Sequence, residues 1–133
     1  MGLDMYGYTM RAEFVGGRQT DVKVETEADR EAAQLNHIAY WRKFNHLHGW
    51  MATLYAEKGG SVDPLNCANV RLNADDLDRL EQALDERVLE HTPGFFFGGD
   101  EIHPDDVADT REFITQARAA LADGLAVFYD CWW

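Results

Sequence analysis

The segment Tyr40–Gly49, YWRKFNHLHG, combines side chains that could bind a ligand or exchange protons with side chains that belong in a core. On a helix, at about 100° per residue, several of these residues would lie on one stripe together with residues that precede and follow the segment. The stripe consists of His37, Trp41, Phe44, His48, Met51 and Tyr55. Arg42 and His46 fall opposite, and Lys43 lies on the flank. Two interpretations of His48 remain: a hydrogen-bonded core imidazole, or one wall of an aromatic cleft.

Two more polar residues, in segments expected to form strands, would complete a candidate ligand cleft. The cleft would consist of Trp41, His48, Arg71 and Asp130. Asp130 shares a strand face with Phe128 and Trp132, so its carboxyl should either have a raised pKa or pair with a cation. If the first and last strands are neighbours, a polar cluster would form from Asp4, Arg42, Arg71 and Asp130. A structural ion pair is a commoner outcome of such a cluster than catalysis.

Metal-binding signatures such as HExxH and CxxC do not occur in the sequence. His46 and His48 are two residues apart, which on a helix directs them away from each other. Other possible metal ligands could join them only if the tertiary structure brings them close: His91, Asp100, Glu101 and His103. No nucleophile signature surrounds Cys67 or Cys131, and Cys131 is better interpreted as a small buried thiol. We therefore expect no metal, no cofactor and no catalytic residue.

The periodicity of the apolar residues predicts the elements that would position these side chains. Alternating Tyr6, Tyr8, Met10, Ala12 and Phe14 predict a strand, and a Gly16-Gly17 turn before Asp21–Thr26 predicts a hairpin. Helical structure should begin at Thr26, with Asp29 three residues on. It continues to Tyr55 as one helix or as two with a break near Asn36. Further strands are expected at Asn69–Leu72, in GFFFGG (Gly94–Gly99) and over residues 125–133.

Two more helices are predicted from capping residues and apolar spacing. Asn73 would cap a helix that ends near His91 and buries Leu77, Leu80, Leu84 and Val88. Pro104 would begin another that ends at Gly124 and buries Val107, Ile114, Ala117 and Leu121. The element order is β-β-α-β-α-β-α-β. We predict one α+β domain over residues 1–133, with a small mixed or antiparallel sheet and about three helices mainly on one face.

Negative charge is concentrated in one part of the chain. The net charge is −12, and residues 73–112 contain 13 acidic and three basic side chains, a net −10. Such a surface repels phosphates, which argues against direct binding of nucleic acid. It serves either solubility or the attraction of a protein with a basic surface. In the second case the partner-binding residues would be Asp75, Asp78, Asp85, Glu86, Glu90, Asp105 and Asp106.

The bulk properties indicate a compact cytoplasmic protein. A length of 133 residues with 46% hydrophobic side chains suits a single folded domain and argues against disorder. No apolar run approaches the roughly 20 residues that span a bilayer, and no basic-then-apolar segment marks a secretory signal. Two cysteines outside any CxxC fit a reducing compartment.

Five motifs occur in an order that resembles a family of small proteins common in bacteriophage and prophage genomes. They are MGLDMY, YWRK with NHLHGW, NC with NVRLNADDLDRLE, HTPGFFFG and ADGLAVFYDCWW. The family form of the second motif is closer to YWRKHPNLHG, and this chain departs from it at Phe44-Asn45-His46. In the last motif, Cys131 stands where the family usually has serine. The resemblance implies a phage-related setting in a host cell and no particular chemistry. The sequence also lacks the GxxxxGK[ST] and GxGxxG loops of nucleotide-binding proteins.

We therefore expect a small acidic phage or prophage accessory protein that binds a host or phage protein without catalysis. A sharper hypothesis is an inhibitor of a host defence complex, similar to an anti-CRISPR protein, whose carboxylates replace nucleic acid phosphates. The alternative is a small-ligand-binding protein or enzyme that uses the Trp41, His48, Arg71 and Asp130 cleft. The partner and the oligomeric state are left open by the sequence.

Overall fold

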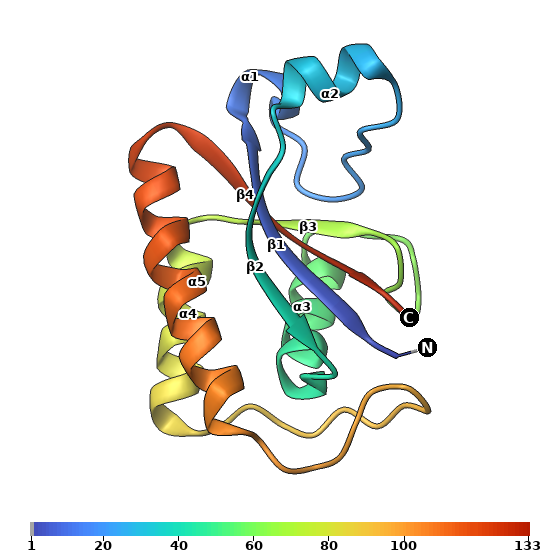
Figure 1. Cartoon of the computed structure of the whole chain (residues 1–133), viewed down its shortest axis with the longest axis vertical. Coiled ribbons are helices and arrows are strands. Elements are labelled where there is room, and N and C mark those ends of the chain that lie inside the picture. Colours follow the sequence, from blue (N-terminus) through green and yellow to red (C-terminus); the bar gives the residue numbers. More distant parts are fainter. Residues whose placement is uncertain (1) are drawn as a thin grey trace.

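A computed structural model describes residues 2–133, which form one antiparallel sheet with helices packed on it (Figure 1). The sheet has the strand order β2-β1-β4-β3. Its strands are β1 (Asp4–Arg11), β2 (Asn36–Arg42), β3 (Asn69–Leu72) and β4 (Leu125–Trp132). The helices are α1 (Ala12–Val15), α2 (Glu27–Ala33), α3 (Asn45–Glu57), α4 (Ala74–Glu86) and α5 (Pro104–Ala122). The predicted α+β class is confirmed.

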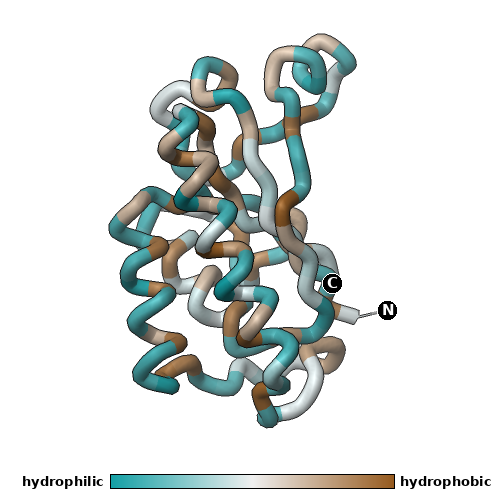
Figure 2. Tube along the Cα trace, turned by 60° about the vertical axis from the view of Figure 1, so that its left-hand side comes forward, coloured by the Kyte–Doolittle hydropathy of each residue, from teal (hydrophilic) through white to brown (hydrophobic). Residues whose placement is uncertain are grey.

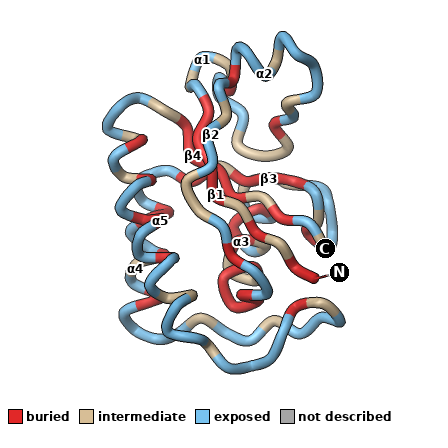
Figure 3. Tube along the Cα trace, viewed as in Figure 1, coloured by how far each residue is buried: buried red, intermediate tan, exposed pale blue. Residues whose placement is uncertain are grey.

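The main core lies between one face of the sheet and helices α3, α4 and α5. Strand β4 is central and contributes Val127, Tyr129 and Cys131 to this core. Strand residues alternate between the two faces of a sheet, so the intervening residues of β4 point to the opposite side. Figure 3 shows the buried residues concentrated in the central strands and on parts of the three helices. Helices α4 and α5 alternate between hydrophilic and hydrophobic residues along their lengths (Figure 2).

Capping boxes start two helices at the residues that the sequence indicates. Thr26 caps α2, with its hydroxyl accepting from the Asp29 amide while the Asp29 carboxylate accepts from the Thr26 amide. Asn73 and Asp76 make the same reciprocal pair at the start of α4. Each box satisfies backbone donors that would otherwise lack partners.

Close packing between β1 and α5 requires a glycine at position 7. A Cβ atom placed there would lie 2.6 Å from a ring carbon of Phe113. Phe113 in turn makes an edge-to-face contact with Trp41 of β2 at a centroid distance of 5.2 Å. The absent side chain therefore lets α5 approach the sheet and bury two large aromatic rings.

The opposite face of the sheet is covered only at one end. There Tyr8, Met10 and Phe128 pack with Val22 and with residues from α1 and α2. Residues 19–22 run beside β3, where the Arg71 amide donates to the Gln19 carbonyl (2.8 Å) and the Asp21 amide to the Asn69 carbonyl (3.1 Å). This segment occupies the hydrogen-bonding edge that β3 would otherwise expose.

The predicted hairpin of residues 6–14 with Asp21–Thr26 is wrong. Strand β1 ends at Arg11, and its two edges are taken by β2 and β4, which leaves no edge for residues 21–26. Residues 21–26 form an irregular segment, and the residue before it, Thr20, makes an isolated bridge to Val70. Asp21 has a φ of 58°, which is incompatible with a regular strand.

The predicted helical stripe through residues 37–55 is also wrong. A break near Asn36 exists, but the chain continues as strand β2 to Arg42 before α3 begins at Asn45. Lys43, with a φ of 58°, makes the change of direction. His37 is exposed, and His46, expected on the outer side, is buried. The burial of Trp41, Phe44, His48, Met51 and Tyr55 is nevertheless as predicted.

Two smaller predictions fail in the segment between α4 and α5. GFFFGG is a turn-containing loop rather than a strand, with Phe97 buried and Phe95 94% exposed. Helix α4 ends at Glu86, so Val88 is exposed instead of buried. None of the helices described between residues 2 and 133 has the length and apolar character needed to cross a membrane.

Candidate functional site

The sheet divides the cleft predicted from Trp41, His48, Arg71 and Asp130. Trp41 and the His48-bonded Tyr129 belong to the core on the helix-covered face. Arg71 alternates with the core residues Val70 and Leu72, and Asp130 alternates with Tyr129 and Cys131, so both lie on the opposite face. The four residues therefore do not form one site, and this prediction is corrected.

Trp41 and His48 are satisfied core residues. The Trp41 indole N–H donates to the Thr110 Oγ1 atom over 3.0 Å. His48 Nδ1 lies 2.8 Å from the Tyr129 hydroxyl, and both residues are buried. Burial lowers the pKa of His48 to about 4, so its imidazole is neutral at pH 7. Of the two interpretations of His48, the structure supports the core one.

The predicted polar cluster of Asp4, Arg42, Arg71 and Asp130 separates into three arrangements, although β1 and β4 are neighbours as it required. Asp4 accepts from the Tyr40 hydroxyl (2.6 Å) and from Arg42 (2.8 Å), and these bonds hold the pKa of its carboxyl below the usual value. Arg71 donates to the Gly16 carbonyl. Asp130 forms no ion pair within 4 Å among the described residues. It follows the other predicted outcome, a raised pKa.

Asp130 lies at the floor of a cavity on the open face of the sheet. The cavity has a volume of about 580 Å³, within the range of small-molecule sites. Its floor is made by Tyr8, Asn69 and Asp130. The walls are Asp21, Val22, Lys23, Val24, Glu25 and Leu35 on one side and Ser61, Val62, Cys67 and Ala68 on the other.

A hydrogen-bonded chain holds the floor of this cavity. The Asn69 amide donates to the Tyr8 hydroxyl (2.8 Å), and that hydroxyl donates to the Asp130 carboxyl (3.3 Å). Asn69 also bonds both the amide and the carbonyl of Val22, which fixes its orientation. Burial raises the pKa of Asp130 from 3.8 to about 6, against the lowering effect of its bonds from the Cys131 amide and Tyr8. The carboxyl thus titrates close to neutrality.

The two walls of the cavity are joined by Tyr55 of α3. Its hydroxyl donates to the Asp21 carboxylate (2.7 Å) and accepts from the amides of Ser61 and Val62 (3.1 and 3.0 Å). One buried phenol therefore connects the segment after α1 to the segment after α3. This connection fixes the two walls relative to each other.

The acidic surface consists largely of exposed side chains on α4, α5 and the intervening loop. Of the predicted residues, Asp106 alone is half-buried, and burial, with the charges of Asp109 and Asp105, raises its pKa. Two others are partly neutralised, since Asp78 pairs with Arg118 (2.8 Å) and Asp85 with Arg111 (2.9 Å). The remaining members are exposed: Asp75, Glu86, Glu90 and Asp105.

The other candidates for chemistry are placed apart. Cys131 is buried, and burial raises the pKa of its thiol to about 12, while Cys67 is exposed. Within residues 2–133, no three His, Cys, Asp or Glu side chains converge as a metal site. His46 bonds the Asp100 carbonyl through Nε2 (3.0 Å), and its buried Nδ1 has no hydrogen-bond partner among the described residues.

Tyr8 and Asn69, which line the cavity, and Tyr55, which joins its walls, are residues that sequence reasoning did not assign to a site. Tyr8 was recognised as a strand residue, and Asp130 as an unusual carboxyl, but their contact depends on the antiparallel register of β1 and β4. In that register Tyr8 lies opposite Phe128, one same-face position from Asp130. The one available signal was the alternation that places Tyr8 and Asp130 on matching strand faces.

No family model, curated protein or solved structure gives a significant match to this chain.

Proposed function

We propose that the protein is a small acidic phage or prophage accessory protein that binds a host or phage protein without catalysis. The single observation that carries this proposal is the density of exposed carboxylates in one continuous stretch of the chain. Of the 13 acidic residues between positions 73 and 112, ten are exposed. A surface of this kind accelerates association with a basic protein and favours it over acidic competitors.

The carboxylates differ in how much charge they offer a partner. Asp76 is buried and forms ion pairs with Lys58 and Arg79, so it serves the fold. Asp78 and Asp85 share their charge with Arg118 and Arg111. Glu86 makes no ion pair within 4 Å among the described residues and is exposed at the end of α4. Glu86 is therefore expected to contribute more to partner binding than either ion-paired neighbour.

Phe95 supplies an exposed apolar ring in the loop that joins α4 to α5. It is 94% exposed and makes an edge-to-face contact with Phe96 at 4.8 Å. Asp100 and Glu101 follow in the same loop. An exposed aromatic ring among charges is typical of an interface anchor, so the proposed partner combines a basic surface with a pocket for an aromatic ring.

A sharper form of the proposal is an inhibitor of a host defence complex in the cytoplasm of the host. Its exposed carboxylates would occupy basic sites that otherwise receive nucleic acid phosphates. Such binding should weaken steeply as salt concentration rises. It should also compete with nucleic acid for the same partner.

The test begins with affinity capture of the tagged protein from infected host lysate, followed by mass spectrometry. The captured partner is then measured against a variant in which Asp78, Asp85 and Glu86 are replaced by lysine. The control replaces Glu27, Glu31 and Asp123, which are exposed outside the acidic surface, and changes the net charge equally. We expect the first variant to lose at least about tenfold in affinity while the control stays within about twofold. Equal binding by both variants would refute the proposal.

A further inference from the structure

We propose that the cavity floored by Tyr8, Asn69 and Asp130 binds a small organic cation, a primary ammonium or guanidinium compound with a short apolar body. Asp130 would be the counter-ion of the cationic group. This site lies on the open face of the sheet and involves none of the acidic residues assigned to partner binding. It is therefore independent of the proposed function.

The shape and lining of the cavity fit a ligand with one charged end. Its floor is lined by Asp130 and Tyr8, and its walls include the apolar residues Val22, Val24 and Val62. A volume of about 580 Å³ accommodates a compact small molecule. A cationic head at the floor and an aliphatic body between the walls would contact both kinds of surface.

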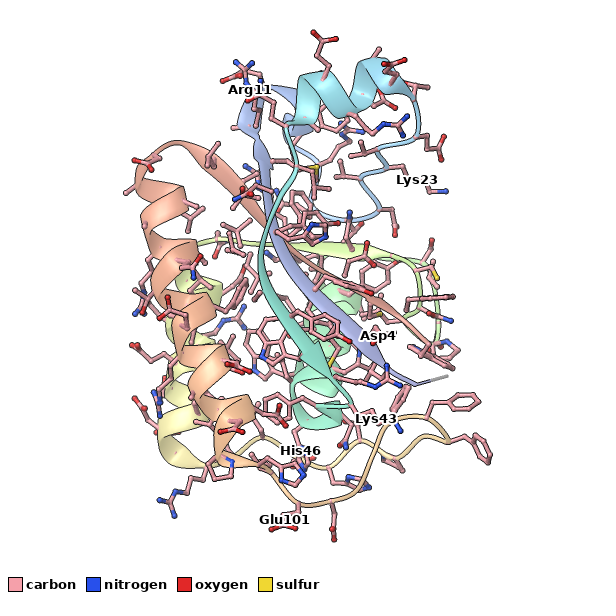
Figure 4. The ribbon with its side chains drawn as sticks, viewed as in Figure 1. Asp4, Arg11, Lys23, Lys43, His46 and Glu101 are labelled. Atoms are coloured by element: carbon pink, nitrogen blue, oxygen red, sulfur yellow. The ribbon has the colours of Figure 1, made fainter. Side chains whose placement is uncertain are left out.

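The charge of the lining selects a cation over an anion. Three carboxylates line the cavity, from Asp21, Glu25 and Asp130, against one cation, Lys23. Lys23 is exposed, and Figure 4 shows its side chain extending outward from its loop, away from the sheet. Glu25 is exposed as Lys23 is, so the half-buried Asp21 and Asp130 supply the negative charge of the cavity, and an incoming ammonium group would complement it.

Asp130 gains more from a bound cation than an exposed carboxylate would. It is half-buried, and its present hydrogen bonds come from neutral groups, the Tyr8 hydroxyl and the Cys131 amide. The other titratable groups around it are Tyr6 and Tyr8 from β1, Cys131 from β4 and Cys67 from the segment before β3. None of these is a cation at pH 7. A charge-assisted bond to a ligand would offset the desolvation of the ionised carboxyl.

The site is already organised for binding. Asn69 orients Tyr8, and Tyr8 orients Asp130, while Tyr55 joins the two walls. These contacts are made by buried residues of β1, β3 and α3, which are rigid elements of the fold. Little conformational entropy would be lost when a ligand enters.

The test uses four probes of matched length, n-butylammonium, n-butylguanidinium, n-butanol and butyrate, titrated into ¹⁵N-labelled protein at pH 7.5. We expect the two cations to shift the Asn69 side-chain amide and the Val22 and Cys131 backbone amides in a saturable manner. The neutral and anionic probes should leave these signals in place. The cations should also slow alkylation of the exposed Cys67 by iodoacetamide.

Two variants connect the binding to the proposed residues. Asp130→Asn should weaken cation binding by about tenfold or more, because it removes the charge and keeps the shape. Asp109→Asn, an exposed acid on α5, should leave it unchanged. Val62→Lys tests the mouth of the cavity with an exposed residue, so it remains informative if Asp130→Asn fails to fold. The tethered ammonium should compete with the probes.

Three results would overturn the proposal. They are no saturable shift at the cavity with either cation, shifts confined to α4 and α5, or equal responses to n-butanol and n-butylammonium. Loss of cation binding in a folded Asp130→Asn or Val62→Lys variant would support it. Because the acidic surface is untouched in both variants, capture of a protein partner should be unaffected by them.

Discussion

His48 Nδ1 and the Tyr129 hydroxyl lie 2.8 Å apart inside the core, and their bond joins α3 to the central strand β4. Both side chains are buried, so neither can replace its partner with water. Phe97 packs edge-to-face against the same imidazole, with ring centroids 5.1 Å apart. His48 thus links α3 to the sheet through a hydrogen bond and to the loop before α5 through the Phe97 ring.

Replacing His48 by Gln should destabilise the protein by about 1–3 kcal/mol, because the Tyr129 hydroxyl would lose a buried partner. Urea unfolding monitored by tryptophan fluorescence measures the change. Activity in any partner-binding assay should fall only in proportion to the loss of folded protein. Tyr129→Phe provides the second arm of a double-mutant cycle, in which we expect a coupling of about 1 kcal/mol. A loss of binding at unchanged stability would contradict the core role of His48.

Asp76 should be the most sensitive carboxylate of the acidic segment. Burial alone would raise its pKa, but bonds from the Asn73 amide, Lys58 and Arg79 lower it below the usual value. Asp76→Asn leaves Lys58, whose side chain is 14% exposed, without its counter-ion, and should cost about 3 kcal/mol. The neighbouring Asp75 is exposed, so Asp75→Asn should change the free energy of unfolding by less than about 0.5 kcal/mol. Similar losses of unfolding free energy from both variants would show that the buried pair of Asp76 and Lys58 stabilises the fold no more than an exposed carboxylate does.

Thr110 connects the buried indole of Trp41 to α5. Its hydroxyl accepts from Trp41 Nε1 (3.0 Å) and donates to the Asp106 carbonyl (2.7 Å). Thr110→Val keeps the volume and removes the acceptor, so it should destabilise the fold by about 1–3 kcal/mol. Thr110→Ser keeps the hydroxyl and should retain most of that stability. Chemical denaturation of the two variants compares them directly, and a greater loss from Ser would mean that packing, not the hydrogen bond, dominates at this position.

Local signals in the sequence predicted several elements well. Strand β3 has the predicted limits, Asn69–Leu72, and Asn73 caps α4 through the reciprocal bond with Asp76. Pro104 begins α5, whose predicted residues Ile114 and Ala117 are buried. Each of these signals acts within a few residues of the chain, because capping and apolar spacing are local properties.

The failure at residues 37–44 has a specific physical cause. Trp41, Phe44 and His48 are buried both in the expected helix and in the observed strand-to-helix path, so burial alone could not separate the two. The deciding contact is the pairing of β2 with β1, whose residues are 27 to 38 positions apart in the sequence, such as Tyr6 with Tyr40. Periodicity within one segment carries no information about such a partner.

The cavity was predicted only through Asp130. Its other floor residues reach it because β1 and β3 both pair with β4. Tyr8 lies opposite Phe128, one same-face position from Asp130, and Asn69 lies opposite Asp130 itself. Long-range register of this kind follows from the whole sheet.

Acid titration should reveal two opposite contributions to stability. The pKa of His48 is lowered from 6.5 to about 4 by burial, so the unfolded state binds its proton first and stability is lost as pH falls from 6.5 towards 4. The pKa of Asp130 is raised from 3.8 to about 6, so this group stabilises the fold at low pH and that stability is lost as pH rises from 3.8 through 6. Each contribution is at most about 3 kcal/mol.

Single variants should separate these two contributions, which largely cancel in the parent protein between pH 4 and 6. Relative to the parent, His48→Gln should regain stability as pH falls from 7 to 4.5, whereas Asp130→Asn should lose stability over the same interval. Urea unfolding at pH 4.5, 5.5 and 7 measures both differences, and comparison with the parent removes the effect of the other carboxylates. Asp109→Asn, exposed on α5, serves as the control and should follow the parent. If the unfolding free energies of all three variants changed in parallel with pH, burial would not be shifting the pKa of His48 downward or that of Asp130 upward.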